Sequence, residues 1–493
     1  MSKIGGKIKS MIRNWLEIQP STGDSILIQE VNTFAGTCFR NEIWYRGDPS
    51  ELHQYYTQVD DLMNNTKFWA AQSTDGVDFR KIHTGLPALI VDMLADIIID
   101  ALNKISIKNS NEAQKVWEKI EKENAFKDIV KQAIIDVFVD GDGAFKISYD
   151  PDISQYPIIE FYSGNNVEYE YKRGRIVATI FKTRYKKEEG TYVLYERYSK
   201  SGITYKLYLN NKKAKINDID ETKGLSEITD NIFIMAIPMM FNKSKKFKGR
   251  GQSIFEKKID DFDSLDEVWS QWIEALRDNK TQTYIPEDLI PQDEKGNYLK
   301  PNTWDKRFVK IGSSMSEDGS KSDKVIRVTG DFDYEKMLQG YITALDLCLQ
   351  GLISPSTLGI DTKKLDNADA QREKEKVTQY TRNKVIRVLE RVLPLVAITC
   401  LKTYDKLNHK ASKIEYEADA DFGEYSSPSF EAVVETISKA RPGQTIMSIE
   451  RSVEELYGDS LTQKEKEEEV KRLKEEAGII QKDEPNIMNP IIE

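Results

Sequence analysis

Two short segments of the chain place carboxylates close enough together to hold a metal ion. Asp140 and Asp142 flank a glycine in DVFVDGDGAFK, and Glu417, Asp419 and Asp421 alternate in KIEYEADAD. Hard cations prefer such oxygen ligands, so either group could serve a metal-dependent nuclease or nucleotidyltransferase. Neither group follows the EF-hand pattern. Turn chemistry explains the first group and strand alternation the second without any metal.

The segment GRGQS (249–253) is a second candidate, because backbone N–H groups before a helix can bind a phosphate. It lacks the strand–loop–helix context and the Lys-Ser/Thr pair of a nucleotide-binding loop, so we interpret it as a helix entry. The sequence has no HExxH or GxSxG motif. Its three histidines and three cysteines are too few and too scattered for a metal centre or a disulfide framework. We therefore expect no catalytic residue, no cofactor and no metal.

The charge of the chain argues against a protein that grips nucleic acid. The formal net charge is −10, from 81 acidic and 71 basic residues, whereas a duplex-gripping protein carries a basic footprint that neutralises phosphates. The chain either ignores nucleic acid or handles it without holding it. No apolar run approaches the roughly 18 residues that a membrane helix needs, and the scattered cysteines are typical of a reducing cytoplasm.

The first half of the chain is expected to be a helical base that carries a β-sheet layer. Residues 85–104 are apolar except where Asp92, Asp96 and Asp100 recur every four positions, which predicts a helix with one acidic face. From about 140 to 240, alternating segments separated by Asn, Gly and Lys turns predict strands. The sequence therefore predicts an α+β fold.

The second half is dominated by helices. Apolar residues three or four positions apart predict an amphipathic helix over 252–279, and a second helix follows at 331–353. Between them, residues 281–330 alternate short β-like pieces with polar linkers. A loop over 353–370 then precedes a very long helix over 371–410.

The first of these helices has an acidic polar face, and the last contains a proline. The acidic positions are Asp260, Asp263, Asp266, Glu267 and Glu274. Pro394 removes a backbone N–H and clashes with the preceding turn, so it predicts a helix kink. A ring of subunits would bury the apolar faces between neighbours and turn the acidic faces toward a central space.

Four segments, in this order, resemble the portal proteins of tailed bacteriophages, of the kind found in siphophages and myophages of Gram-positive hosts. They are NEIWYRGDPSELHQYY (41–56), GRGQSIFEKKIDDFDSLDEVWSQWIE (249–274), ISPSTLGIDTKKLDNADAQREKEKVTQYTRNKVI (353–386) and KARPGQTIMSIERSVEELYGD (439–459). The resemblance runs from about 35 to 475 and is weakest between 285 and 325.

The resemblance implies a layout of the chain. Residues 1–250 would form the N-terminal part of the wing, 251–280 and 331–353 the two stem helices, 281–330 the clip, 354–370 the tunnel loop, 371–430 the long kinked helix and a wing strand, 431–480 the crown and 481–493 a flexible tail.

The resemblance also implies a function, namely a twelve-subunit ring at one capsid vertex through which double-stranded DNA is packaged and ejected. Its partners would be the terminase large subunit, head–tail adaptors, and the major capsid and scaffolding proteins, with no membrane and no cofactor. It would be found in the virion, and in the host cytoplasm during assembly. The tunnel-loop residues facing DNA would be Asp361, Lys363, Lys364, Asp366 and Asn367. Contacts of this kind touch the DNA backbone and read no sequence; the alternative for the two lysines is a solvated loop.

Two other functions stay open on the sequence alone. One is a metal-dependent nuclease or other nucleic-acid enzyme built on the acidic groups described above. The other is a different structural protein of a phage head–tail junction or a minor capsid protein.

Overall fold

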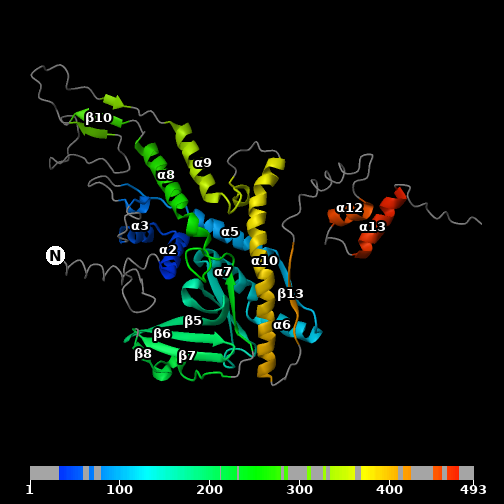
Figure 1. The fold of residues 1–493 in the computed structure, drawn as a ribbon. Coiled ribbons are helices and arrows are strands. Elements are labelled where there is room, and N and C mark those ends of the chain that lie inside the picture. The colour runs from blue at the N-terminus through cyan, green and yellow to red at the C-terminus, as the bar shows by residue number, and fades with distance from the viewer. Residues whose placement is uncertain are drawn as a thin grey trace, which may run out of the picture. The chain divides into compact units, whose positions relative to one another are not determined.

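The computed structural model describes residues 33–58, 66–71, 79–210, 212–229, 233–278, 282–286, 308–311, 326–328, 333–360, 368–408, 415–423, 448–457 and 463–476. The chain divides into two compact units, residues 1–422 and 423–493. The fold is α+β, as the sequence predicts (Figure 1). No helix in these ranges is long and apolar enough to cross a membrane.

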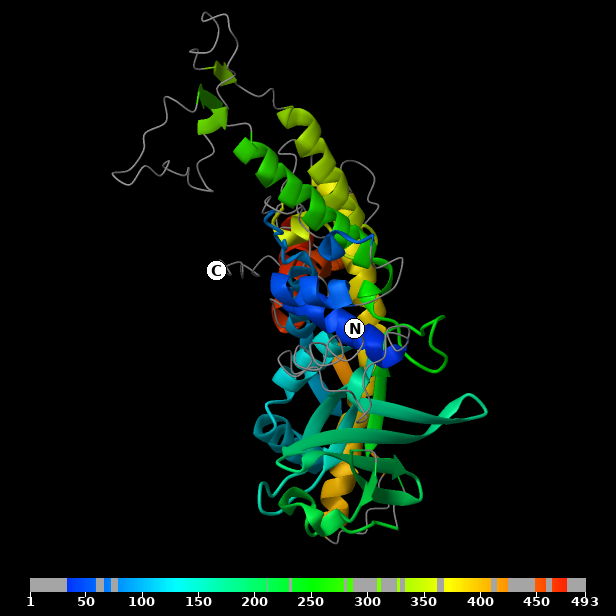
Figure 2. The same cartoon turned by 90° about the vertical axis from the view of Figure 1, so that its left-hand side faces the viewer.

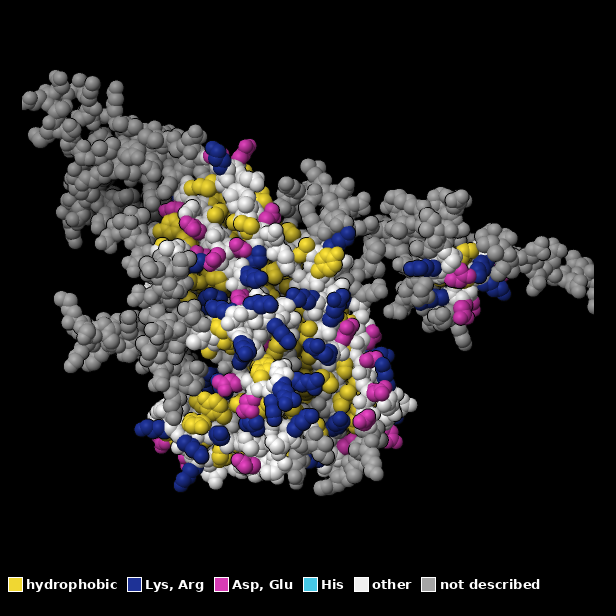
Figure 3. Space-filling model, viewed as in Figure 1, with side chains coloured by type: hydrophobic (Ala, Val, Ile, Leu, Met, Phe, Trp, Pro, Cys, Tyr) yellow, Lys and Arg dark blue, Asp and Glu magenta, His cyan; other side chains and the backbone are white. Residues whose placement is uncertain are grey.

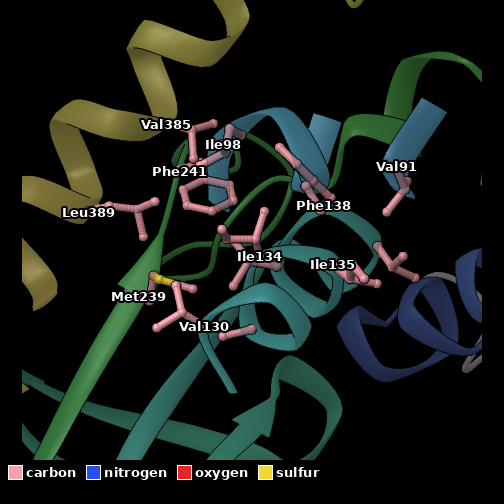
Figure 4. Close-up of a cluster of buried hydrophobic side chains, with 14 of the residues drawn as sticks. Val91, Ile98, Val130, Ile134, Ile135, Phe138, Met239, Phe241, Val385 and Leu389 are labelled. Atoms are coloured by element: carbon pink, nitrogen blue, oxygen red, sulfur yellow. The ribbon is translucent and has the colours of Figure 1, made fainter. Parts of the chain in front are cut away.

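A layer of helices forms the base of the first unit. Its members are α2 (Phe34–Arg46), α3 (Pro49–Gln58), α5 (Leu86–Asp100), α6 (Asn111–Glu123) and α7 (Phe126–Asp140). α5 begins after Gly85, which takes a left-handed conformation, and has a proline in its first turn, where the missing N–H costs nothing. Its apolar residues meet those of α7 and α10 in one core, which Figure 4 shows around Ile98, Ile134 and Leu389.

Three antiparallel sheets pack on or beside these helices. β2 (Asp142–Ser148) is the centre of a sheet ordered β3-β2-β9, with β3 at Ile158–Ser163 and β9 at Ala236–Met240. The largest sheet is a meander, β4 (Val167–Lys172), β5 (Arg175–Lys187), β6 (Gly190–Ser199), β7 (Gly202–Leu209) and β8 (Lys212–Ala214), seen at the bottom of Figures 1 and 2.

The third sheet pairs segments from the two ends of the first unit. β1 (Leu102–Ile107) lies antiparallel to β13 (Ala418–Phe422), with Leu102 opposite Phe422. The helix predicted over 85–104 extends into the first residues of β1, so that part of the prediction is wrong.

α8 (Ile259–Asp278) and α9 (Tyr334–Leu349) form an antiparallel pair (Figure 2). A 3-10 turn, Ile254–Lys257, precedes α8, so the helix starts later than the predicted residue 252. The chain between the two helices contributes a three-stranded sheet ordered β11-β10-β12, with strands Gln282–Pro286 (β10), Phe308–Ile311 (β11) and Ile326–Val328 (β12).

α10 (Ala368–Leu407) is a helix of 40 residues that continues through Pro394. Its buried side packs on α5, α6, β9 and β13. The kink expected at Pro394 stays a prediction.

The second unit contains α12 (Ile449–Tyr457) and α13 (Gln463–Glu476), which pack on each other. Lys474 of α13 pairs with Glu450 of α12.

Candidate functional site

The base of α8 is held by a buried carboxylate with four hydrogen-bond donors. Asp266 is fully buried. Its Oδ2 lies 2.7 Å from His83 Nδ1 and accepts from Trp69 Nε1 at 3.2 Å. Its Oδ1 accepts from the backbone N and the hydroxyl of Thr84 at 2.9 and 3.0 Å. A buried carboxylate loses its hydrogen bonds to water. Protein donors must replace them, because each acceptor site left without a donor costs free energy.

Asp263, one turn earlier, binds the same part of the chain. Its Oδ2 accepts from Phe68 N at 3.0 Å, and burial raises the pKa of Asp263 to about 6. Next to it, Lys81 Nζ donates to the carbonyl oxygens of Trp69 and Ala71, and burial lowers the pKa of Lys81 to about 8. The described residues between 66 and 84 are therefore fixed to α8 by a polar network, which we call the α8 anchor.

The α8 anchor corrects the expected acidic face of this helix. Asp263 and Asp266 point into the protein and bind neighbouring backbone and side chains, so they cannot face a central space. Asp260 is exposed and pairs with Lys67. Glu267 accepts from Gln271, and Glu274 pairs with Arg277 at 3.1 Å.

A second anchor involves the GRGQS segment. Arg250 donates to both oxygens of the fully buried Asp142, from Nε at 3.0 Å and from Nη2 at 2.8 Å, and Gly251 N donates to Asp142 Oδ2 at 2.6 Å. The guanidinium also reaches the carbonyl oxygens of Gly164 and Val167 and stacks on the Phe34 ring at 3.8 Å. We call this group the Arg250–Asp142 anchor. It accounts for the segment as a structural helix entry.

Two glycines make the Arg250–Asp142 anchor possible. A Cβ on Gly251 would lie 2.0 Å from the carbonyl oxygen of Gly141, and Gly141 itself has a φ of +106°. Only glycine allows two backbones to approach so closely. Ser253 then caps the 3-10 turn before α8 and donates to Phe138 O at 2.9 Å.

The acidic pairs considered as metal sites are engaged in other contacts. Asp142 is bound by Arg250, and Asp140 is buried, with its pKa raised by burial and by Glu42. On β13, Asp419 pairs with Lys108, and Asp421 accepts from Asn103 at 3.3 Å. Within the part of the chain that the structure describes, no group of three or more His, Cys, Asp or Glu side chains could hold a metal ion.

Aromatic side chains hold α8 and α9 together. Trp269 and Trp272 of α8 lie 5.3 and 5.8 Å, centroid to centroid, from Tyr341 of α9, and Trp272 is 5.9 Å from Tyr334. At the other end of the pair, Lys258 Nζ donates to the carbonyl oxygen of Leu347 at 2.5 Å. The helix pair is therefore fixed along its length as well as at its base.

The remaining candidates from the sequence lie elsewhere. Asp361, Lys363, Lys364, Asp366 and Asn367 fall outside the described residues. The structural roles of His83, Lys81 and Arg250 are not predicted from the sequence. The only signals for them were their polar character within apolar or glycine-rich surroundings.

Among the described residues, the two anchors and the aromatic contacts fix α8 and α9 to each other and to the helices of the first unit. No family model matches the chain, and no curated protein matches it. Among solved structures, it is similar to a chain in the virion of a native gene transfer agent particle, with 12% identity and a TM-score of 0.38, over 72% of this chain and 84% of that one. It is also similar to a chain in the neck of the native particle, with 11% identity, a TM-score of 0.39 and coverage of 78% and 90%. A chain in the neck of the empty particle gives 12% identity, a TM-score of 0.39 and coverage of 75% and 90%. These likenesses are weak in both identity and superposition.

Proposed function

We propose that the chain is the subunit of a portal ring, a non-enzymatic channel at one capsid vertex through which double-stranded DNA enters and leaves a phage head. The observation that carries this proposal is the antiparallel pair α8/α9 with a small sheet inserted between its members. Only three residues separate α8 from β10, and five separate β12 from α9. The inserted sheet therefore lies at one end of the helix pair, opposite the end that the two anchors hold.

The construction suits a stem that carries a docking element. Aromatic side chains fix α8 and α9 to each other, and buried polar contacts fix the beginning of α8 to the rest of the first unit. A helix pair fixed in this way would hold the inserted sheet in one position relative to the helices of the first unit. In a ring, twelve such sheets would form one annular surface. The partners proposed for it are the terminase large subunit and later a head–tail adaptor, with the major capsid and scaffolding proteins around the ring.

The charge of the chain is compatible with a channel that lets DNA slide. Twelve copies at −10 each would carry about −120 before counterions screen them. A ring of net negative charge repels phosphates, so a duplex would pass without being held. Asp263 and Asp266 do not contribute to a channel lining, since they are buried within one subunit.

Native mass spectrometry of the purified chain, together with negative-stain imaging, tests the proposal. We expect closed rings with a central hole and a mass near twelve times 56.7 kDa. Open filaments, or chains that stay single in the presence of capsid and scaffolding proteins, would contradict it. The enzyme alternative makes a different prediction, which is nicking of plasmid DNA that depends on a divalent metal.

A further inference from the structure

The exposed side of α10 carries a row of cations that the net charge of the chain does not lead one to expect. Lys384, Arg387, Arg391 and Lys402 follow one another at helical spacing, and the first three are exposed. Among the exposed positions of α10 between 380 and 402, the one carboxylate is Glu390. Lys and Arg side chains are numerous across the middle of the face seen in Figure 3, which is the face on which α10 lies in Figure 1.

We call this row the basic face. Its cations lack ion pairs with other described residues, and exposed apolar side chains lie among them. None of its four cations has an ion pair or hydrogen bond to another described residue. Two large apolar side chains share the same side of the helix, Tyr380 at 72% exposure and Leu395 at 47%. Unpaired cations interspersed with exposed apolar groups are typical of a surface that another macromolecule covers.

The opposite side of the same core carries the complementary charge. Asp92, Asp96 and Asp100 lie on the outer side of α5, beside the exposed Leu89. Lys131 of α7 forms an ion pair with Asp96 and interacts electrostatically with Asp92 and Asp100. This set of five residues, which we call the acidic face, therefore has three carboxylates to one cation.

Further carboxylates extend the acidic face onto α2 and α7. Tyr45 of α2 donates to Asp92 Oδ1 at 2.8 Å. Burial raises the pKa of both Tyr45 and Glu42, and the nearby carboxylate of Asp136 on α7 adds to the rise. Asp136 is itself partly buried, and burial raises its pKa.

The two faces point away from each other. α5 and α10 both turn their apolar rows to the shared core, through Ile98 on α5 and Val385 and Leu389 on α10 (Figure 4). Asp96 lies on the side of α5 opposite its buried row, and Arg391 lies on the side of α10 opposite its own. One subunit thus presents opposite charges on opposite sides of a single core.

We propose that the basic face of one copy of this chain binds the acidic face of the next copy, head to tail. The proposal rests on the ring proposed above and names the surfaces that join its members. Two different surfaces on one subunit make a heterologous contact, which closes into a ring when the rotation between neighbours allows it. Duplex DNA is the competing occupant of the basic face, but it would leave Tyr380 and Leu395 against a charged phosphate backbone.

Charge reversal on each face tests this pairing. The basic-face variant is Arg387→Glu/Arg391→Glu, and the acidic-face variant is Asp96→Lys/Asp100→Lys. Each variant alone would bring like charges together between neighbours, so we expect each to lose the oligomer and run as a single chain of 56.7 kDa in native mass spectrometry. The oligomer of the unaltered chain should also weaken as ionic strength rises.

An equimolar mixture of the two variants gives the decisive result. The α10 made acidic in the basic-face variant would meet the α5 made basic in the acidic-face variant. At the next contact, the unaltered basic α10 of the acidic-face variant would meet the unaltered acidic α5 of the basic-face variant. We therefore expect the mixture to regain the oligomer, with the two variants alternating and only even numbers of subunits.

The control matched to the basic-face variant is Lys212→Glu/Lys213→Glu on β8, which changes the net charge by the same amount and in the same direction at exposed positions. It should keep the oligomer, and circular dichroism should show every variant folded. The proposal is overturned if both face variants keep the oligomer, if their mixture stays monomeric, or if the unaltered chain is monomeric at low ionic strength. Loss of duplex binding by the basic-face variant with an unchanged mass would assign that face to DNA.

The two proposals can fail separately. Twelve-membered rings that survive both charge reversals would leave the portal function standing and remove this interface. Open filaments that are lost in either charge-reversal variant and form again in the mixture of the two would support the interface and contradict the closed ring.

Discussion

Removing the carboxylate of Asp142 should destabilise the first unit far more than removing an equally well-formed but exposed ion pair. Asp142→Ala deletes the acceptor of three hydrogen bonds, two from Arg250 and one from Gly251 N. The Arg250 side chain, of which only 15% is exposed, would keep its two carbonyl contacts and lose its counter-charge. Breaking a buried pair from one side costs about 3–5 kcal/mol, because an uncompensated charge stays inside, so we expect about 4 kcal/mol.

The matched control is the pair formed by Arg197 and Glu170. Its geometry is also two-pronged, with hydrogen bonds of 2.8 and 2.7 Å, but the side chains are 34% and 40% exposed. Water can therefore replace the lost partner, and Glu170→Ala should cost about 1 kcal/mol or less. The comparison separates the effect of burial from that of geometry.

Tryptophan fluorescence during urea unfolding is the suitable assay. All seven tryptophans precede residue 423, so the signal reports the first unit and not the second. Both variants should unfold with an unchanged dependence on urea, which shows that the same surface is exposed. If Asp142→Ala loses no more stability than Glu170→Ala, the idea that this pair anchors the entry to α8 is wrong.

Two further changes probe α8 itself. Because burial raises the pKa of Asp263 to about 6 from 3.8, its contribution to stability is complete below a pH of about 4 and is lost as the pH rises through 6. Asp263→Asn carries no charge at any pH. In urea unfolding, the free energy of unfolding of this variant, relative to that of the unaltered chain, should therefore rise by up to about 3 kcal/mol between pH 4 and pH 7. A relative value that stays constant over this pH range would contradict the reasoning. Trp272→Ala should cost about 3–5 kcal/mol by emptying the contact with α9, whereas Leu276→Ala, at a position 45% exposed, should change the free energy of unfolding little.

The spacing of apolar residues in the sequence is sufficient to predict most of the helices and strands of the fold. Apolar residues three or four apart place α8 and α9, and alternation places the strands between 140 and 240, because these patterns depend only on the geometry of one element. β1 is different. It runs on directly from an apolar helix, and its partner β13 lies more than 300 residues away, so the segment has no local signal for pairing.

The candidate site could be predicted only in part, for a related reason. A helical projection shows which carboxylates share a side of α8, but it does not show what packs against that side. The neighbour is the polar segment that contains Trp69, His83 and Thr84, which by itself resembles an ordinary loop. Asp263 and Asp266 were therefore predicted to be exposed, whereas their burial depends on a contact across nearly 200 residues of chain.

The burial of these two carboxylates changes what α8 can offer to a channel. An apolar contact tolerates small rotations of a helix, but a carboxylate with four fixed donors allows one orientation about the helix axis. Among residues 259–277, whose exposure the structure describes, the exposed positions of α8 are Asp260, Ser264, Gln271 and Leu276, and Asp260 is paired with Lys67. Three further carboxylates in this range are partly exposed, Asp261, Glu267 and Glu274, and the first and last of them have cationic partners. If α8 lines a channel, a passing duplex meets carboxylates there that are mostly paired with cations, and not an unbroken acidic face. The repulsion that would keep DNA from sticking would then come largely from carboxylates on other elements or from the net charge of the ring as a whole.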